Sequence, residues 1–244
     1  MTPDAPKALH QLGQSLWLDN ISRDLLDHGT LAGYIERNAI TGLTSNPTIF
    51  DHAISRGSAY DDEISRQLDA GLSGEALFFV LAVQDLMRAA DLFALIYART
   101  GTVDGFVSLE VSPLLAYDTA ATLAQAKALH KQAGKPNLFI KIPGTPEGLP
   151  AIEDATFAGI PVNVTLLFCA AHYQAAADAY LTGLERRVAA GLAPDVRSVA
   201  SLFVSRWDVA VADKVPEPLR NTLGIAVGQA TYQGRKAHPR KTAR

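Results

Sequence analysis

The chain has 244 residues, of which 48% are hydrophobic and 19% charged, so it can form one large core and does not have the composition of a disordered protein. The net charge of −3 argues against nucleic acid as the main partner. The single cysteine, Cys169, excludes an intramolecular disulfide, and no signal-peptide pattern begins the chain, so we expect a cytoplasmic protein. The apolar stretch 76–96 is interrupted by Gln84, Asp85, Arg88 and Asp91, so we predict no membrane span.

The charge is unevenly distributed along the chain. Residues 234–244, GRKAHPRKTAR, contain five Lys and Arg residues and no acidic residue, which leaves residues 1–233 with 17 basic and 25 acidic residues. We expect 234–244 to be a disordered, solvated tail, with a functional basic arm as the alternative. Residues 1–233 are predicted to form one domain.

Short apolar runs of strand length alternate with longer segments of helical periodicity. The predicted strands are 15–19, 42–46, 105–111, 137–143, 160–168 and 198–205, and helical patterns include 118–133, 170–190 and 219–233. Such alternation predicts an α/β fold with a parallel sheet, either an open doubly wound sheet or a (β/α)8 barrel. The chain has no G-x-G-x-x-G or P-loop sequence, which favours the TIM (β/α)8-type barrel, here incomplete with six recognisable strands.

The polar residues of the predicted strands fall on one face, because successive residues of a strand point to opposite sides of the sheet. In chain order this face carries Trp17 and Asp19, Thr44 and Asn46, Ser108 and Glu110, Phe139 and Lys141, Asn163 and Thr165, and Ser201 and Phe203. Most of the polar members lie in the C-terminal half of a strand, where (β/α) barrels hold their active sites. We therefore predict a functional site at this end rather than isolated buried polar groups.

Lys141 indicates the chemistry of this predicted site. Burial in an apolar strand disfavours the ammonium form of a lysine, and a neutral amine is the nucleophile that forms a Schiff base with a ketone. Asp19 and Glu110 can supply the proton transfers that a metal-independent aldolase needs. The six histidines are scattered without metal-ligand spacing, and no G-x-S-x-G sequence or rim histidine supports a serine nucleophile. We expect neither a metal nor a cofactor.

Six segments, in order, carry a resemblance to a known family. They are LWLDNISRDLL, GLTSNPTIF, VSLEVSP, FIKIPGT, VNVTLLF and VASLFVSRWD, within residues 14–233. Together they resemble transaldolase, in particular the branch found fused to glucose-6-phosphate isomerase. The resemblance implies a transferase of the pentose phosphate pathway that moves a dihydroxyacetone unit from a ketose phosphate to an aldose phosphate. The implied substrates are sedoheptulose 7-phosphate, fructose 6-phosphate, glyceraldehyde 3-phosphate and erythrose 4-phosphate.

The resemblance also implies a role for each matching residue. Lys141 would be the Schiff-base lysine, and Asp19 the acid/base of carbon–carbon cleavage. Glu110 and Thr165 would hold the water that relays protons during imine formation. The substrate-binding residues would be Asn46, Asn163, Ser201, Phe203 and Arg206, with Arg206 as a bidentate phosphate donor. From the residues alone, Arg206 could instead form a surface ion pair and Phe203 could serve packing.

The sequence departs from the family pattern at its C-terminal end. A closed barrel of this kind needs eight strands, and only six are recognisable before the basic segment. We therefore expect a truncated barrel whose open strand edges would favour aggregation unless another chain, a swapped element or an unusual closure covers them, so that a homo-oligomer is an open alternative. Three functions remain: an active transaldolase, a catalytically weak or inactive fragment, and a fructose-6-phosphate-type aldolase that releases dihydroxyacetone to water.

Overall fold

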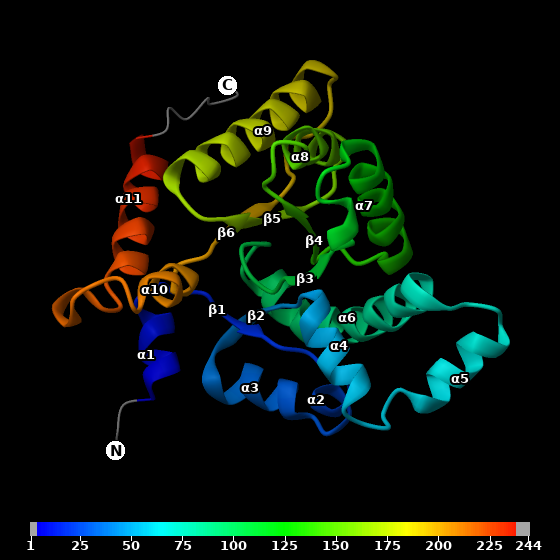
Figure 1. Cartoon of the computed structure of the whole chain (residues 1–244). Helices are drawn as coiled ribbons and strands as arrows, with labels where there is room; N and C mark the ends of the chain where they lie inside the picture. Colours follow the sequence, from blue (N-terminus) through cyan, green and yellow to red (C-terminus); the bar gives the residue numbers. More distant parts are fainter. Residues whose placement is uncertain (1–3, 238–244) are drawn as a thin grey trace. The chain divides into compact units, whose positions relative to one another are not determined.

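The computed structural model describes residues 4–237, in which strands and helices alternate along the chain (Figure 1). The strands are β1 (Leu16–Asp19), β2 (Ile40–Thr44), β3 (Val107–Glu110), β4 (Leu138–Pro143), β5 (Val162–Leu167) and β6 (Ser198–Leu202). They follow one another in the sheet in chain order, and the pairs β1–β2, β2–β3, β4–β5 and β5–β6 are parallel. The predicted α/β fold of an incomplete TIM-type barrel is therefore confirmed.

The chain divides into two compact units. The first comprises residues 4–110 together with Ala128–Phe139, and the second comprises Val111–Lys127 together with residues 140–237. Each unit is described by itself below.

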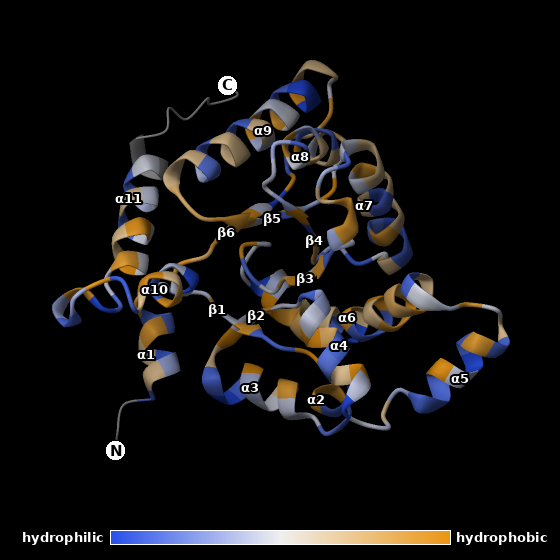
Figure 2. Ribbon diagram, in the orientation of Figure 1, coloured by the Kyte–Doolittle hydropathy of each residue, from blue (hydrophilic) through white to orange (hydrophobic). Residues whose placement is uncertain are grey.

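The first unit is built around strands β1 to β3 and one long helix. Its helices are α1 (Ala5–Gln11), α2 (Arg23–Asp27), α3 (Thr30–Asn38), α4 (Pro47–Ser55), α5 (Asp61–Asp69), α6 (Gly74–Arg99) and the C-terminal part of α7 (Thr119–Ala133). The apolar residues of α6 recur at helical spacing, and Figure 2 shows them as a largely apolar stretch. Phe79, Val83, Leu86 and Phe93 are buried, and the helix lies against β2 and β3. These contacts form the core of the unit.

One face of the strands in this unit carries a layer of aromatic rings. Trp17 and Phe139 stack with their ring centres 6.1 Å apart, and Phe139 stacks on Phe106 at 4.1 Å. Gly42 of β2 makes room for this layer, because a Cβ atom built there would lie 2.5 Å from the Trp17 indole. Trp17 and Phe139 are the two aromatic residues predicted to share a face with Asp19 and Lys141, so their stacking supports that alternation.

The second unit contains β5 and β6, most of β4, and the helices around them. These are η1 (Pro113–Leu115), the N-terminal part of α7, α8 (Gly148–Phe157), α9 (Ala170–Ala189), α10 (Ser205–Val211), η2 (Glu217–Leu219) and α11 (Leu223–Ala237). The core of this unit contains Ile142 of β4, Val162 of β5, Ile152 of α8 and Ala176 of α9, all of which are buried. Helices α8 and α9 approach closely at Gly183, where a Cβ atom would lie 2.6 Å from the Glu153 carbonyl oxygen.

Four predicted strands end earlier than the sequence pattern indicated, and one of them, β3, ends at Glu110, one residue before its predicted end. β2 ends at Thr44, because Asn46 caps α4 and accepts a hydrogen bond from the Ile49 N–H at 3.0 Å. β6 ends at Leu202, because the chain turns into α10 at Ser205. β5 ends at Leu167, and its alternation breaks at Leu166, which adopts a left-handed φ of 60°.

The C-terminal helix reaches into the basic segment of the sequence. α11 ends at Ala237, so the first residues of 234–244 are helical, and residues 238–244 lie outside the described part of the chain. Of the helices between residues 4 and 237, none combines the length and apolar character that a bilayer crossing requires.

Candidate active site

Lys141 is the central residue of the predicted site and lies on β4 in the second unit. The strand is buried at every position, and the whole Lys141 residue is only 6% exposed. Its carbonyl oxygen accepts a hydrogen bond from the Val111 N–H at 3.1 Å. An amine this deeply buried needs polar surroundings, because burial without polar partners is costly.

The neighbouring strand supplies polar side chains beside Lys141. In the register of the parallel pair β4–β5, Lys141 is the partner of Asn163, and Pro143 is the partner of Thr165. Asn163 and Thr165 are both 1% exposed. Paired residues on adjacent strands have side chains on the same face, so the predicted grouping of Lys141, Asn163 and Thr165 holds in this unit.

Ser201 joins this group from β6. Its hydroxyl donates a hydrogen bond to the Asn163 side-chain oxygen, with an Oγ to Oδ1 distance of 2.8 Å. Four of the predicted residues therefore lie on three successive strands of one unit. None of these contacts is local in sequence, since Ser201 and Asn163 are 38 residues apart.

A β-bulge follows Thr165 and shapes the end of β5. The register of β5 against β6 shifts between Val164 and Leu167, and Leu166 has a φ of 60°. A left-handed conformation in a leucine is strained by about 1–2 kcal/mol. The Thr165 carbonyl oxygen accepts the Gly144 N–H at 2.8 Å, which ties the turn after β4 to this bulge.

Arg206 and Phe203 lie beyond the end of β6. The Arg206 guanidinium lies over the Phe203 ring, 4.2 Å from its centre, and Phe203 stacks on Phe168 at 5.4 Å. The Trp207 indole N–H donates to the Phe168 carbonyl oxygen at 2.8 Å. Phe203, predicted to lie on the strand 198–205, is thus outside the observed strand β6, where the chain leads into α10. Phe168 and Trp207 support this aromatic group.

The other three predicted residues belong to the first unit. Asp19 is the last residue of β1 and is exposed, and Glu110 is the last residue of β3 and is half-buried. Asn46 follows β2, and its side-chain oxygen caps α4. The preceding Ser45 donates from its buried hydroxyl to the Ser108 carbonyl oxygen at 2.8 Å, which fastens the end of β2 to β3. All three residues thus lie at the C-terminal ends of their strands.

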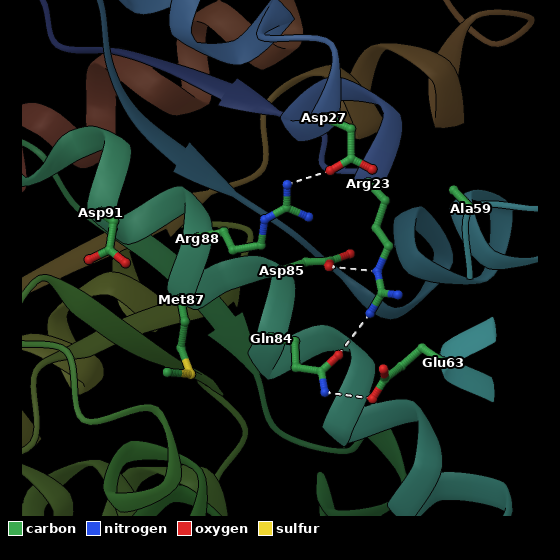
Figure 3. Close-up of a pocket in the computed structure, with 9 residues that line it drawn as sticks. All are labelled: Arg23, Asp27, Ala59, Glu63, Gln84, Asp85, Met87, Arg88 and Asp91. Atoms are coloured by element: carbon green, nitrogen blue, oxygen red, sulfur yellow. Dashed lines mark hydrogen bonds and ion pairs between the residues drawn. The ribbon is translucent and has the colours of Figure 1, made fainter. Parts of the chain in front are cut away.

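A polar pocket in the first unit was not predicted as a site. It has a volume of about 490 Å³ and lies among α2, α5 and α6 (Figure 3). Its lining consists of Arg23, Asp27, Ala59, Glu63, Gln84, Asp85, Met87, Arg88 and Asp91. The only sequence signal was the polar interruption of the apolar run 76–96, which we used as evidence against a membrane span.

A hydrogen-bonded network around a fully buried carboxylate occupies one wall of this pocket. Asp85 accepts hydrogen bonds from Arg23 Nε at 3.1 Å and from the Tyr60 hydroxyl at 2.7 Å, and Arg23 also donates to Gln84 at 2.8 Å. Burial raises the pKa of the Asp85 carboxyl, although the Tyr60 and Arg23 hydrogen bonds oppose the shift. Burial also raises the pKa of the Tyr60 phenol, and the Asp85 charge adds to the effect. The network connects three helices, which is a structural role.

The described residues contain no cluster that could bind a metal ion. Between residues 4 and 237, no three His, Cys, Asp or Glu side chains come together in a way that could hold a metal ion.

Comparison with known proteins identifies relatives over most of the chain. The family model described as transaldolase/fructose-6-phosphate aldolase matches residues 16–243. A transaldolase of Thiobacillus denitrificans is 44% identical over 237 residues, covering 93% of this chain and 66% of the relative. A transaldolase of Thermobifida fusca is 47% identical over 232 residues, covering 92% of this chain and 63% of the relative. A protein named transaldolase 2 from a Nostoc species is 41% identical over 212 residues, covering 86% and 56%. The chain thus spans about three-fifths of the length of these relatives.

Proposed function

Since the chain belongs to the transaldolase/fructose-6-phosphate aldolase family, we propose that it is a transaldolase working through a Schiff base on Lys141. The observation that carries this proposal is the burial of Lys141 on β4 beside Asn163 and Thr165. A water-excluded amine among polar side chains suits attack on a ketose carbonyl. The proposed substrates are ketose and aldose phosphates: sedoheptulose 7-phosphate, fructose 6-phosphate, glyceraldehyde 3-phosphate and erythrose 4-phosphate.

The proposed reaction begins with addition of the Lys141 amine to the ketose carbonyl. Loss of water then leaves an iminium ion, and Glu110 and Thr165 are assigned the water that carries protons in this step. Asp19 is assigned the next step, in which it accepts the hydroxyl proton of the leaving aldehyde as the carbon–carbon bond breaks. The bound three-carbon enamine adds to the acceptor aldehyde, and water finally releases the lysine. The roles of Asp19 and Glu110 rest on their motifs LWLDN and LEVSP.

The remaining residues are assigned to substrate binding. Asn46, Asn163 and Ser201 would hydrogen-bond sugar hydroxyls, and Phe203 would border the bound sugar. Arg206 would bind the phosphate, since a guanidinium offers two parallel N–H donors to an anion. Arg206 is exposed, which makes its donors accessible to a ligand from solvent.

Reductive trapping tests the proposal. Fructose 6-phosphate and borohydride should leave a reduced adduct on the peptide that contains Lys141, located by mass spectrometry. Lys141→Met should abolish the adduct, whereas Lys127→Ala, a change at an exposed lysine of α7, should retain it. Folding of each variant is checked by circular dichroism. A folded wild type that forms no adduct would overturn the proposal and favour the inactive-fragment alternative.

Adding an acceptor aldehyde distinguishes the proposed transaldolase activity from the aldolase alternative. With fructose 6-phosphate and erythrose 4-phosphate together, a transaldolase should form sedoheptulose 7-phosphate, which NMR detects. An aldolase should instead release free dihydroxyacetone at a rate that the acceptor does not lower. The family description names both activities, so this comparison decides between them.

A further inference from the structure

The Arg206 guanidinium is held by an aromatic ring. Its central carbon lies 4.2 Å from the centre of the Phe203 ring. Among residues 4–237, the guanidinium forms no ion pair and no hydrogen bond besides this contact. Arg206 is also exposed, so little else restrains its long side chain. The orientation of this cation therefore depends on the ring of Phe203.

The Phe203 ring is itself fixed at the end of β5. The Phe203 N–H donates to the Leu167 carbonyl oxygen at 2.8 Å, and the ring stacks on Phe168 with an interplanar angle of 17°. The Trp207 indole in turn donates to the Phe168 carbonyl oxygen at 2.8 Å. β5 is the strand that pairs with β4 at Lys141, and all of these residues belong to the second unit. The ring therefore has a defined place relative to the strand beside Lys141.

A ring in this position can prepare an arginine for an anion. The negative face of the ring attracts the cation, while the N–H groups at the edge of the guanidinium remain able to donate in its plane. Ordering a long side chain when a ligand binds costs free energy, so a guanidinium that is already held in place binds an anion more tightly than a freely rotating one. Loss of the ring should therefore weaken anion binding without removing the charge.

We propose that Phe203 is a positioning residue that acts through Arg206, holding the guanidinium ready for the phosphate of the sugar. This inference rests on the proposed function, because it concerns the phosphate assigned to Arg206. It gives the Phe203 ring an indirect part in substrate binding in place of a direct border with the sugar. The effect of the ring should therefore require both the phosphate and Arg206.

Another arginine over a phenyl ring in the same unit provides a matched control. The Arg186 guanidinium lies over the Phe157 ring, 4.5 Å from its centre, and ion pairs to Glu153 and Asp154 also hold it. Phe157 is half-buried, as Phe203 is, and ends α8. Phe157→Leu therefore removes a comparable ring from beneath a cation that has no assigned part in substrate binding.

The test is a double-mutant cycle on the trapping reaction with borohydride. Phe203→Leu should raise the fructose 6-phosphate concentration for half-maximal trapping by about 2- to 5-fold, the loss expected for an exposed cation–π contact. The trapping rate at saturation and the trapping of unphosphorylated fructose should not change. Phe203→Tyr, which keeps a ring, should behave as the wild type, and so should Phe157→Leu. In an Arg206→Ala background, Phe203→Leu should cause no further rise.

A second variant separates the charge of the ring face from its shape. Pentafluorophenylalanine in place of Phe203 keeps a six-membered ring, but fluorine withdraws the negative charge from the face that attracts a cation. This variant should raise the half-maximal concentration as Phe203→Leu does, so the test does not depend on the folding of the leucine variant. Circular dichroism checks the folding of each variant.

Three results would contradict the inference while the proposed function stands. Equal losses with fructose 6-phosphate and fructose would mean that the Phe203 ring borders the sugar directly. An equal rise in the wild-type and Arg206→Ala backgrounds would mean that the ring does not act through the guanidinium. A similar rise from Phe157→Leu would assign the effect to the stability of the unit. No adduct in the folded wild type would instead refute the proposed function itself, and the inference with it.

Discussion

The Arg206 guanidinium lies over the Phe203 ring, 4.2 Å from its centre, and Phe203 in turn stacks on Phe168. The ring contacts one face of the planar guanidinium cation. The N–H groups at the edge of the guanidinium can therefore donate hydrogen bonds, in its plane, to an anion. This arrangement is one that suits a phosphate-binding arginine at the start of a helix, and it makes the assignment of Arg206 open to direct test.

Arg206→Ala should weaken trapping of phosphorylated substrate only. We expect the fructose 6-phosphate concentration for half-maximal trapping to rise about 10- to 100-fold, since charge-assisted hydrogen bonds contribute about 1.5–3 kcal/mol. Unphosphorylated fructose should be trapped at the wild-type rate. Arg197→Ala, at an exposed arginine paired with Asp195, is the control and should change neither. Equal losses with both sugars would remove Arg206 from phosphate binding.

Trp207→Phe should destabilise the protein by about 1 kcal/mol. The substitution keeps an aromatic ring against Phe168 but removes the indole N–H that donates to the Phe168 carbonyl oxygen at 2.8 Å. Urea unfolding followed by circular dichroism measures the change. Tyr117→Phe, at a side chain that is 79% exposed, should alter the free energy of unfolding by less than about 0.5 kcal/mol. Comparable effects of the two changes would show that the indole hydrogen bond contributes nothing.

Gly42→Ala should destabilise the first unit by about 1–3 kcal/mol, the usual range for overpacking. A Cβ atom there would lie 2.5 Å from the Trp17 indole, which stacks on Phe139 and cannot move without opening that layer. Gly57→Ala is the control, because its Cβ atom would meet nothing closer than an Asp24 oxygen at 3.9 Å. Thermal unfolding compares the two. A neutral Gly42→Ala would mean that the aromatic layer is loosely packed.

Glu63 should contribute stability that disappears in acid. Hydrogen bonds from Gln84 and Gln67 hold the pKa of the Glu63 carboxyl below its ordinary value of 4.5. The unfolded chain therefore binds the proton first as the pH falls, and the contribution is lost between 4.5 and the lower native pKa. The difference in unfolding free energy between wild type and Glu63→Gln should shrink through this range. A constant difference from pH 6 to pH 3 would contradict the shift.

The contribution of Asp85 to stability should depend on pH with the opposite sign to that of Glu63. Burial raises the pKa of its carboxyl above the ordinary 3.8, so the folded state holds the proton to higher pH than the unfolded chain. The contribution of Asp85 to stability should therefore fall as the pH rises from 3.8 to the higher pKa of the folded state. The difference between wild type and Asp85→Asn should decrease with rising pH, in contrast to Glu63→Gln. Parallel pH profiles for the two variants would show that the network does not shift the pKa values of the two carboxyls in opposite directions.

The sequence by itself determined the order of strands and helices, the face of the strands that carries Lys141, Asn163 and Thr165, and the family. These follow from local rules, because strand periodicity and motif spacing depend on neighbouring residues. Even the early end of β2 has a local cause, since a capping asparagine before a proline starts a helix.

Only the tertiary structure decided which side chains meet. Ser201 bonds to Asn163 and Arg23 bonds to Asp85 across separations of 38 and 62 residues. Such pairs depend on strand register, on the bulge at Leu166 and on helix packing, and a shift of one residue in register would turn each side chain to the other face. Periodicity selects a face, but the partner of each side chain is set by the three-dimensional packing of distant segments.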